Sequence, residues 1–326
     1  MLNNTVITEE WTLSLFRAYE RISTLLTYGK FGAKLQFTKK DIQKLPQSGK
    51  STKNMHITSL HTYPVKSLAG ISLPRVLVEK RGLAYDRRWM LVDRDGLFIS
   101  QREIPQLALL LPDFSLQGLI IRHRYEGLEP LTIPLHPPEG AKKMEVQIWD
   151  DRCTGLLTSR EADEWFSNAL HTRCHLVYMP DESIRPLSGS NGRTGEIVSF
   201  ADSCPLLVIG EASLADLNGH LKEPVPMSRF RPNIVFAGGL PYEEEDWKAF
   251  TISNVSFRGI RPCGRCQIVN IDQESAEKGK EPLQALGQLR RRGNKVVFGL
   301  YAAMTEEGES PVHLQVGDKI VVQPTT

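Results

Sequence analysis

The stretch Gly259-Ile260-Arg261-Pro262-Cys263-Gly264-Arg265-Cys266 places two of the chain's five cysteines three positions apart, among several arginines. The flanks at residues 251–259 and 267–271 alternate and are rich in β-branched residues, which predicts two strands with both cysteines on the turn between them. A thiolate is a soft ligand for metals such as zinc and copper(I), and neighbouring positive charge favours the thiolate form. The stretch therefore predicts a β-rich fold that presents a thiol at a strand turn.

Taken alone, the Cys-x-x-Cys pair has three ordinary interpretations: half a zinc site, a redox dithiol, or two buried thiols without chemistry. A zinc site requires two more closely spaced ligands, and the remaining cysteines, Cys153, Cys174 and Cys204, are scattered. A thioredoxin-like dithiol should open a helix in a βαβ unit, which strand-like flanks do not predict. Free cysteines are often buried, but the arginines favour a turn that reaches solvent or an anion.

Length and composition limit the classes of protein to which this chain can belong. With 326 residues, 40% of them hydrophobic and 24% charged, the chain can form one or two globular domains. The formal net charge of +2 gives no strong field for nucleic acid. Five scattered cysteines favour a reducing, cytoplasmic compartment. No apolar run approaches the roughly 18 residues that a membrane span needs, and no secretory signal pattern is present.

Residues 1–54 read as an N-terminal extension, an amphipathic helix followed by a basic linker. Leu15, Tyr19, Ile22 and Leu26 form one helical stripe, which is typical of a helix packed on a domain. A peripheral contact with a membrane or a partner is the alternative. A mitochondrial transit peptide is the other alternative, although the early pair of glutamates at positions 9 and 10 is unusual for one.

From residue 55 onward, short alternating segments separated by Gly and Pro predict a β-rich α+β fold. We expect two β-rich domains, at residues 55–178 and 179–326, divided near a polar, Gly-rich loop. Helices are expected at residues 162–169 and 211–221. Strands are expected at residues 56–63, 72–78, 88–93, 119–123, 144–149, 233–236, 250–257, 267–271, 295–301 and 319–322.

Several turns combine basic and small polar residues, the types that bind phosphate: Pro64-Val65-Lys66-Ser67, Asp86-Arg87-Arg88-Trp89, Phe200-Ala201-Asp202-Ser203 and Arg229-Phe230-Arg231-Pro232-Asn233. Each one alone is typical of a solvated turn or a cap. Their combination in one chain indicates an anion site assembled from several turns.

These pieces occur in a fixed order along the chain, together with Ser100-Gln101-Arg102, Glu211-Ala212-Ser213-Leu214, Cys263-Gly264-Arg265-Cys266, Glu281-Pro282-Leu283, Phe298-Gly299-Leu300-Tyr301 and Val316-Gly317-Asp318. The ordered set resembles the MOSC family, named for the C-terminal domain of molybdenum cofactor sulfurase. Within that family it is most similar to the stand-alone amidoxime-reducing (mARC-type) proteins and their bacterial relatives. The resemblance covers about residues 55–323 and implies a MOSC-N-type β-rich domain followed by a MOSC β-barrel.

The resemblance also implies a site for a molybdenum cofactor in a cleft between the two domains. It assigns Cys263, the first cysteine of the pair, as the molybdenum ligand and leaves Cys266 a structural role. It places Lys66, Ser67 and Arg87 on the cofactor's phosphate. The pterin and phosphate would be held by Asp202, Ser203, Arg231 and Asn233, with Tyr301 near the metal. Leu300, where relatives often carry Gln, departs from the family pattern.

The implied activity is reduction of N-hydroxylated small molecules, with Cys263, Asp202 and Tyr301 as catalytic candidates. The electrons would come from a separate donor protein of the ferredoxin, flavoprotein or cytochrome b5 type. A cofactor carrier or sulfur-handling module without turnover is the alternative. The basic run at residues 290–294 is typical of a solvated hairpin tip, with a lid or a donor-docking patch as alternatives.

Overall fold

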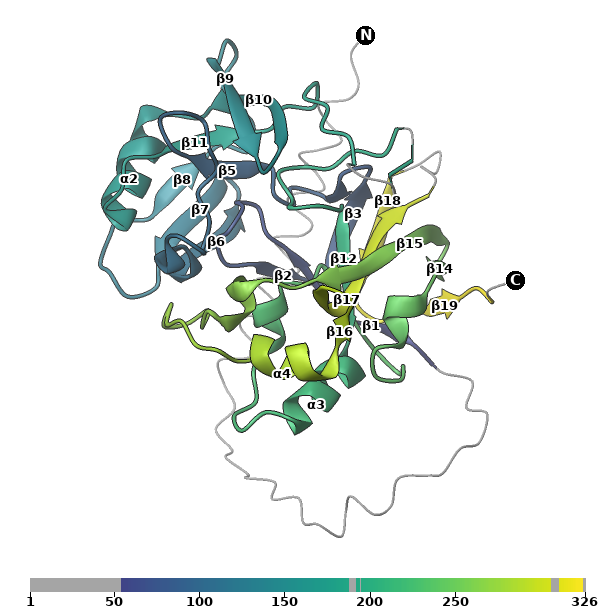
Figure 1. Ribbon diagram of the computed structural model, residues 1–326. Helices are drawn as coiled ribbons and strands as arrows, with labels where there is room; N and C mark the ends of the chain where they lie inside the picture. The colour runs from purple at the N-terminus through teal and green to yellow at the C-terminus, as the bar shows by residue number, and fades with distance from the viewer. Residues whose placement is uncertain (1–53, 188–191, 194, 306–310, 325–326) are drawn as a thin grey trace, which may run out of the picture.

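The computed structural model describes residues 54–187, 192–193, 195–305 and 311–324 (Figure 1). The predicted helix and basic linker of residues 1–54 lie outside the described residues, apart from Asn54. Within the described ranges, none of the helices combines the length and the apolar character that a membrane crossing requires. The predicted β-rich α+β class is confirmed, since strands dominate and few helices are present.

The largest sheet of the described residues has nine strands and joins the two ends of the chain. Along its main path the order is β19 (Ile320–Val322), β14 (Ala249–Ile252), β15 (Val255–Gly264), β17 (Lys295–Met304), β12 (Leu206–Gly210), β13 (Ile234–Ala237), β1 (His56–Thr62) and β2 (Ile71–Leu73), with β16 (Arg291–Arg292) paired to β17. The pairing of β12 with β13 is parallel, and the other pairs are antiparallel. The strands that begin the described chain thus extend a sheet built by its second half.

Aromatic side chains fill the core beside this sheet. Phe250 and Phe257 face each other across the β14–β15 hairpin, with ring centroids 5.4 Å apart, and Trp247 packs on Phe250 at 5.3 Å. Both phenylalanines are fully buried. Burying such a side chain contributes about 1.5–3 kcal/mol, so this cluster is a main source of the sheet's stability.

Three smaller sheets complete the fold. One has the order β5 (Trp89–Val92), β11 (His175–Tyr178), β10 (Asp151–Leu157) and β9 (Lys143–Ile148). The second has the order β6 (Leu110–Ser115), β7 (Gly118–His123) and β8 (Leu131–Ile133). The third has the order β18 (Val312–Gln315), β3 (Arg75–Glu79) and β4 (Gly82–Leu83), so that it also pairs an early strand with a late one.

The helices lie at opposite ends of the molecule (Figure 1). The first, α2 (Arg160–Leu170), begins where the Ser159 hydroxyl accepts a hydrogen bond from the Ala162 amide, and it buries Phe166 against the β6–β8 sheet. The other two are α3 (Glu211–Gly219) and α4 (Leu283–Leu289). Short 3₁₀ turns are η2 (Pro105–Leu109), η3 (Met227–Phe230), η4 (Glu243–Asp246) and η5 (Gln267–Asn270).

Both predicted helices are present, and the predicted strands at residues 56–63, 88–93, 119–123, 144–149, 233–236, 295–301 and 319–322 are confirmed. The predicted strand at residues 250–257 is instead a hairpin, because Ser253 adopts a left-handed turn conformation (φ 52°). The predicted strand at residues 267–271 is wrong: η5 lies there. A short apolar run does not distinguish a strand from a buried helical turn.

Candidate functional site

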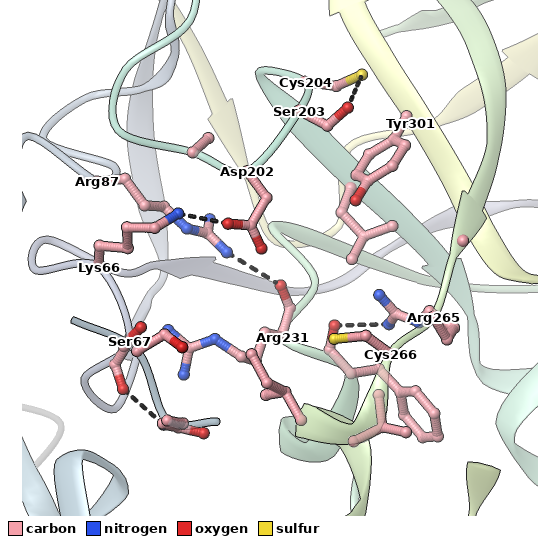
Figure 2. A pocket seen from close by; sticks show the side chains of 18 of the residues that line it. Lys66, Ser67, Arg87, Asp202, Ser203, Cys204, Arg231, Arg265, Cys266 and Tyr301 are labelled. Atoms are coloured by element: carbon pink, nitrogen blue, oxygen red, sulfur yellow. Dashed lines mark hydrogen bonds and ion pairs between the residues drawn. The ribbon is translucent and has the colours of Figure 1, made fainter. Parts of the chain in front are cut away.

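A pocket forms where turns from the two halves of the chain meet (Figure 2). Every turn singled out in the sequence contributes to it. The predicted residues that line it are Lys66, Ser67, Arg87, Asp202, Ser203, Arg231, Asn233 and Tyr301. The fold thus gathers eight predicted side chains from distant parts of the chain, and Cys263 is the one predicted site residue that is not in the lining.

The turns that carry the basic side chains have left-handed backbones at non-glycine residues. The φ values are 71° at Ser67, 51° at Arg87 and 55° at Arg231. Such conformations cost about 1–3 kcal/mol each and persist only where the surroundings enforce them. Backbone hydrogen bonds from the Lys66 amide to Trp89 O and from the Arg87 amide to Tyr63 O, both 2.8 Å, hold two of these turns together.

Lys66 and Asp202 form an ion pair at one side of the pocket, with Nζ 2.5 Å from Oδ1. Nζ also donates to Phe200 O at 2.9 Å. The lysine is 6% exposed and the aspartate 47%. Burial lowers the pKa of Lys66 despite its partner. For Asp202, desolvation acts to raise the pKa, but the ammonium of Lys66 outweighs it and holds that pKa well below the usual range. Asp202 is therefore an ionised carboxylate throughout the physiological range.

Two of the pocket arginines lie over the ring of one tyrosine. The guanidinium carbons of Arg87 and Arg231 lie 4.2 Å and 4.3 Å from the ring centre of Tyr63. Arg87 pairs with the buried Asp86, whose oxygens are 2.8 Å and 2.6 Å from Nη1. Arg231 has no carboxylate partner among the described residues, and burial lowers its pKa to about 10. It is still a cation at neutral pH, and the nearby Asp86 and Asp202 act on it without a direct ion pair.

The predicted ligand Asn233 lines the pocket while its amide is engaged by the backbone. Its Oδ1 accepts a hydrogen bond from the Leu207 amide at 3.1 Å, and its Nδ2 donates to His61 O at 3.2 Å. The side chain ties β12 to β1 at the level of the pocket. Asn233 therefore fixes the wall as well as contributing to its surface.

The two cysteines of the Cys-x-x-Cys pair face different environments. Cys263 lies on β15, is fully buried and packs with Phe230 and Phe298 in the core. Its Sγ accepts a hydrogen bond from Arg265 Nη1 at 3.0 Å. Cys266 follows the end of β15, is half-buried and lines the pocket. Of this pair, the second cysteine lines the pocket, where Cys204 is a further thiol. The assignment of Cys263 as the metal ligand stays a prediction.

The reason lies in the register of β15. Its pairing with β17 shifts twice, between Gly259 and Arg261 and again between Pro262 and Gly264, which turns Cys263 toward the core. The chain then leaves the strand, and Cys266 caps η5 from an extended conformation. Arg102 Nη2 lies 3.1 Å from the Cys266 Sγ, so a cation faces this thiol.

Tyr301 stands on β17 beside both cysteines. Burial, together with the neighbouring Cys263 thiol, raises its pKa well above the usual value, so the phenol keeps its proton. The Arg261 guanidinium lies over its ring at 5.0 Å and donates to the Ser203 hydroxyl. Ser203 is thereby held at the pocket rim.

An outer chamber continues the pocket toward solvent. The inner pocket measures about 120 Å³ and the outer one about 450 Å³. They share Arg102, Asp202, Ser203, Gly264, Arg265, Cys266 and Tyr301. Because the two spaces are contiguous, together they fall in the range of about 300–1,000 Å³ typical of small-molecule and cofactor sites.

Sequence reasoning missed several pocket cations. Arg102, Arg229 and Arg265 line the inner pocket, and Gln101 reaches it from the same turn as Arg102. The Ser100-Gln101-Arg102 turn belonged to the ordered set of pieces, so its position in that order was the available signal. Arg265 sits inside the cysteine stretch itself. The Nε atoms of Arg229 and Arg265 are buried without a hydrogen-bond partner, which leaves donors to spare.

Comparison with known proteins matches two family models to successive parts of the chain. A model of the MOSC N-terminal beta barrel domain matches residues 54–173, and a model of the MOSC domain matches residues 195–321. The chain is 32% identical to the molybdenum cofactor sulfurase of Oryza sativa subsp. japonica over 84% of its length and 36% of that protein. The sulfurase of Bos taurus is 30% identical over 81% of this chain and 32% of its own length. This chain thus spans about a third of the sulfurases that it matches.

A third relative has a similar length. Mitochondrial amidoxime-reducing component 1 of Mus musculus is 29% identical, and the match covers 81% of each chain.

Proposed function

Because the chain belongs to the MOSC-domain family, we propose that it is an oxidoreductase that uses a molybdenum cofactor to reduce N-hydroxylated substrates. The observation that carries the proposal is a pocket-facing thiol, Cys266, with the Arg102 guanidinium 3.1 Å from its sulfur. In the same pocket, Arg102, Arg231 and Arg265 have no carboxylate partner among the described residues. An anionic group that also offers a metal to a thiolate matches this set of donors.

The pocket residues fit such a cofactor chemically. A phosphate favours several N–H donors and positive charge, which Lys66, Ser67, Arg87 and Arg231 supply. Arg229 and Arg265 add two further guanidinium groups to the same wall. We therefore retain Lys66, Ser67, Arg87, Ser203, Arg231 and Asn233 as the proposed cofactor-binding residues.

We propose Cys266 rather than Cys263 as the metal ligand. A ligand must reach the cavity, and Cys263 is fully buried in an apolar cluster while Cys266 lines the pocket. Each thiol has an arginine beside it, Arg102 at Cys266 and Arg265 at Cys263, so access to the cavity is what separates the two. Cys263 then supports the site from behind, through Arg265 and Tyr301.

When bound, the cofactor supplies the two-electron chemistry that breaks an N–O bond. That reaction consumes two protons, giving an N–H product and water. Tyr301 carries a phenol proton at the pocket wall, and its raised pKa keeps that proton in place for hydrogen bonding to a substrate. Asp202 is ionised and bound to Lys66, so its proposed role is to position that lysine rather than to donate a proton.

The electrons would come from a separate donor protein of the ferredoxin, flavoprotein or cytochrome b5 type. A second candidate function is a cofactor carrier or sulfur-handling module. One observation favours it: the sulfurases match this chain at 30–32% identity, over about a third of their length. Catalytic turnover separates the two candidates, because a carrier binds molybdenum without reducing a substrate.

The test starts from the full chain, purified from a host that makes the molybdenum cofactor. Molybdenum and zinc per chain are measured by plasma mass spectrometry, and reduction of benzamidoxime is followed with a small-molecule reductant. Near-stoichiometric molybdenum with reduction supports the reductase. Molybdenum without reduction favours the carrier, and zinc without molybdenum contradicts both.

A further inference from the structure

The outer chamber has walls of its own beyond those shared with the inner pocket. They are Trp149, Arg261, Leu283, Asn294, Lys295 and Val296. Two of these residues are cations and none is an anion. The chamber's one carboxylate, Asp202, is shared with the inner pocket and is already paired with Lys66. The space that leads from solvent to Cys266 is therefore positively charged.

Neither cation of the outer chamber is neutralised by the protein. Arg261 donates to the Ser203 hydroxyl and lies over Tyr301, both neutral groups. Lys295 is exposed and has no ion pair among the described residues. By contrast, Arg290 and Arg292, a few residues before Lys295, are 2.6 Å and 2.9 Å from the buried Glu245. The cations that line the outer chamber are thus left without a carboxylate partner within the described part of the chain, while Arg290 and Arg292 outside it are paired.

The same chamber also has an aromatic residue in its wall, Trp149. Trp149 occupies the turn between β9 and β10 in a left-handed conformation (φ 54°), and its side chain is 42% exposed. It is held from several sides: the Arg102 guanidinium lies 4.4 Å from its ring centre, and Phe98 packs at 4.9 Å. A large apolar side chain in a strained turn marks a position that the surroundings enforce. Leu283 and Val296 add further apolar surface.

We propose that the outer chamber is the substrate-specificity site and that it selects flat substrates bearing a negative charge, such as an aromatic ring with a carboxylate. Trp149 provides the surface for the ring, and Arg261 and Lys295 attract the anion. The inference rests on the proposed function in one respect, because it takes the chamber as the route by which a substrate reaches Cys266.

A charge series tests the selectivity in the molybdenum-loaded full chain. The substrates are 4-carboxybenzamidoxime, benzamidoxime and 4-(trimethylammonio)benzamidoxime, which differ in the sign of one remote charge. We expect kcat/KM to fall from the anion to the cation by about tenfold at low ionic strength, and the ratio to shrink as salt is added. Lys295→Gln and Arg261→Gln should each reduce that ratio by about threefold. Lys248→Gln, an exposed lysine outside both pockets, is the matched control and should leave it unchanged.

A binding measurement tests the charge selectivity without requiring catalytic turnover. The probes are 4-carboxybenzamide, benzamide and 4-(trimethylammonio)benzamide, which carry no N–O bond. Their binding to the full chain is followed by tryptophan fluorescence, with Trp149→Phe identifying the responding ring. We expect the anion to bind most tightly, in a manner that weakens in Lys295→Gln.

The two arms separate the two hypotheses. Selective anion binding without reduction of any amidoxime supports the chamber's charge selectivity and contradicts the reductase. Reduction that is equal for the three substrates, with equal binding of the three probes, overturns the charge selectivity and leaves the reductase standing.

Discussion

Two sets of arginines in this molecule, none of them exposed, differ in their partners. The first set holds the segment that leads into the pocket: Arg185 lies 2.8 Å from Asp151, and Arg258 lies 2.6 Å from Glu196. We refer to these as the framework arginines. The second set, Arg102, Arg231, Arg261 and Arg265, lines the two chambers and has no carboxylate partner among the residues that the structure describes.

The difference separates arginines that stabilise the fold from arginines that are available to bind a ligand. A charge withdrawn from water is stable when it is paired and hydrogen-bonded, as Arg185 is by Asp151 and by the carbonyls of Ser199 and Ala201. A charge left unpaired costs folding free energy, and a bound anion removes that cost. The framework arginines therefore serve stability, and the chamber arginines serve a ligand.

The largest effect is expected within the cysteine pair, because we expect one cysteine to serve ligand binding and the other to serve stability. Cys266→Ser should lose bound molybdenum and reduce activity to background, because it removes the pocket-facing thiol. Cys263→Ser should keep both and lose about 1–3 kcal/mol of unfolding free energy, because a hydroxyl replaces a thiol in an apolar cluster. Metal content, activity and urea unfolding of the two variants are measured side by side. The opposite pattern would return the metal ligand to Cys263.

A smaller but still large effect is expected at Arg231. Arg231→Gln should weaken cofactor retention by about 2 kcal/mol or more, roughly thirtyfold, because an anion loses an unpaired cation. Without cofactor, its unfolding free energy should be unchanged or slightly higher, since a charge without a direct ion pair has been removed. Molybdenum content after dialysis and urea unfolding provide the two readouts. Retained molybdenum with reduced stability would place Arg231 among the framework arginines.

Arg258 should behave in the opposite way. Arg258→Gln leaves the mostly buried Glu196 without its cation and should cost about 3–5 kcal/mol of unfolding free energy, measured by urea denaturation. The double variant Arg258→Gln/Glu196→Gln should recover part of that loss. If the single and double variants are equally destabilised, the ion pair itself is not what supports the segment.

The smallest effect is expected at Glu244, where a buried carboxyl keeps its proton instead of pairing with a cation. It is fully buried, has no cation partner within the part of the chain that the structure describes, and accepts hydrogen bonds from the Ser213 hydroxyl and the Gly210 amide. Burial raises its pKa to about 7. The folded state therefore holds a proton that the unfolded state releases above about pH 4.5, so unfolding free energy falls as pH rises through this window, by about 1–3 kcal/mol.

Glu244→Gln should flatten that part of the stability–pH curve, because the amide does not titrate. Urea unfolding of both proteins between pH 4.5 and pH 7.5 gives the comparison. Parallel curves for the two proteins would show that Glu244 is ionised in the fold, and that a buried charge is tolerated there without a partner.

The sequence predicted which turns meet at the pocket better than it predicted which single side chains line it. Lys66, Arg87, Asp202 and Arg231 could be named because each stands on a turn next to a strand, where short polar stretches interrupt apolar alternation. Cys263 was assigned as the metal ligand through the family resemblance alone. Which thiol of the pair lines the pocket depends on two register shifts in β15 that alternation does not reveal. Arg102 was missed as a pocket residue because it follows no strand and is brought in by tertiary packing alone.

The fold was predictable in class and in most strands, but not in how distant strands pair. The residues of β1 alternate as any half-buried strand does, and nothing local indicates that Ile57 pairs with Phe236. The same holds for β3, where Val78 pairs with Val312. Short apolar runs were also ambiguous, because a run of this length is compatible with a strand or with a helical turn. The four residues of η5 are an example.

The pairing of β1 with β13 has a consequence for how the chain is made. Ribosomes add about 5–20 residues per second, so β1 emerges roughly 10–40 s before its partner exists. During that interval Ile57 and Leu60, both fully buried in the finished protein, belong to a strand that has β2 on one edge and no partner on the other. Such edges invite pairing with other chains. Synthesis, more than the finished structure, is therefore the stage at which this protein most needs protection from misassembly.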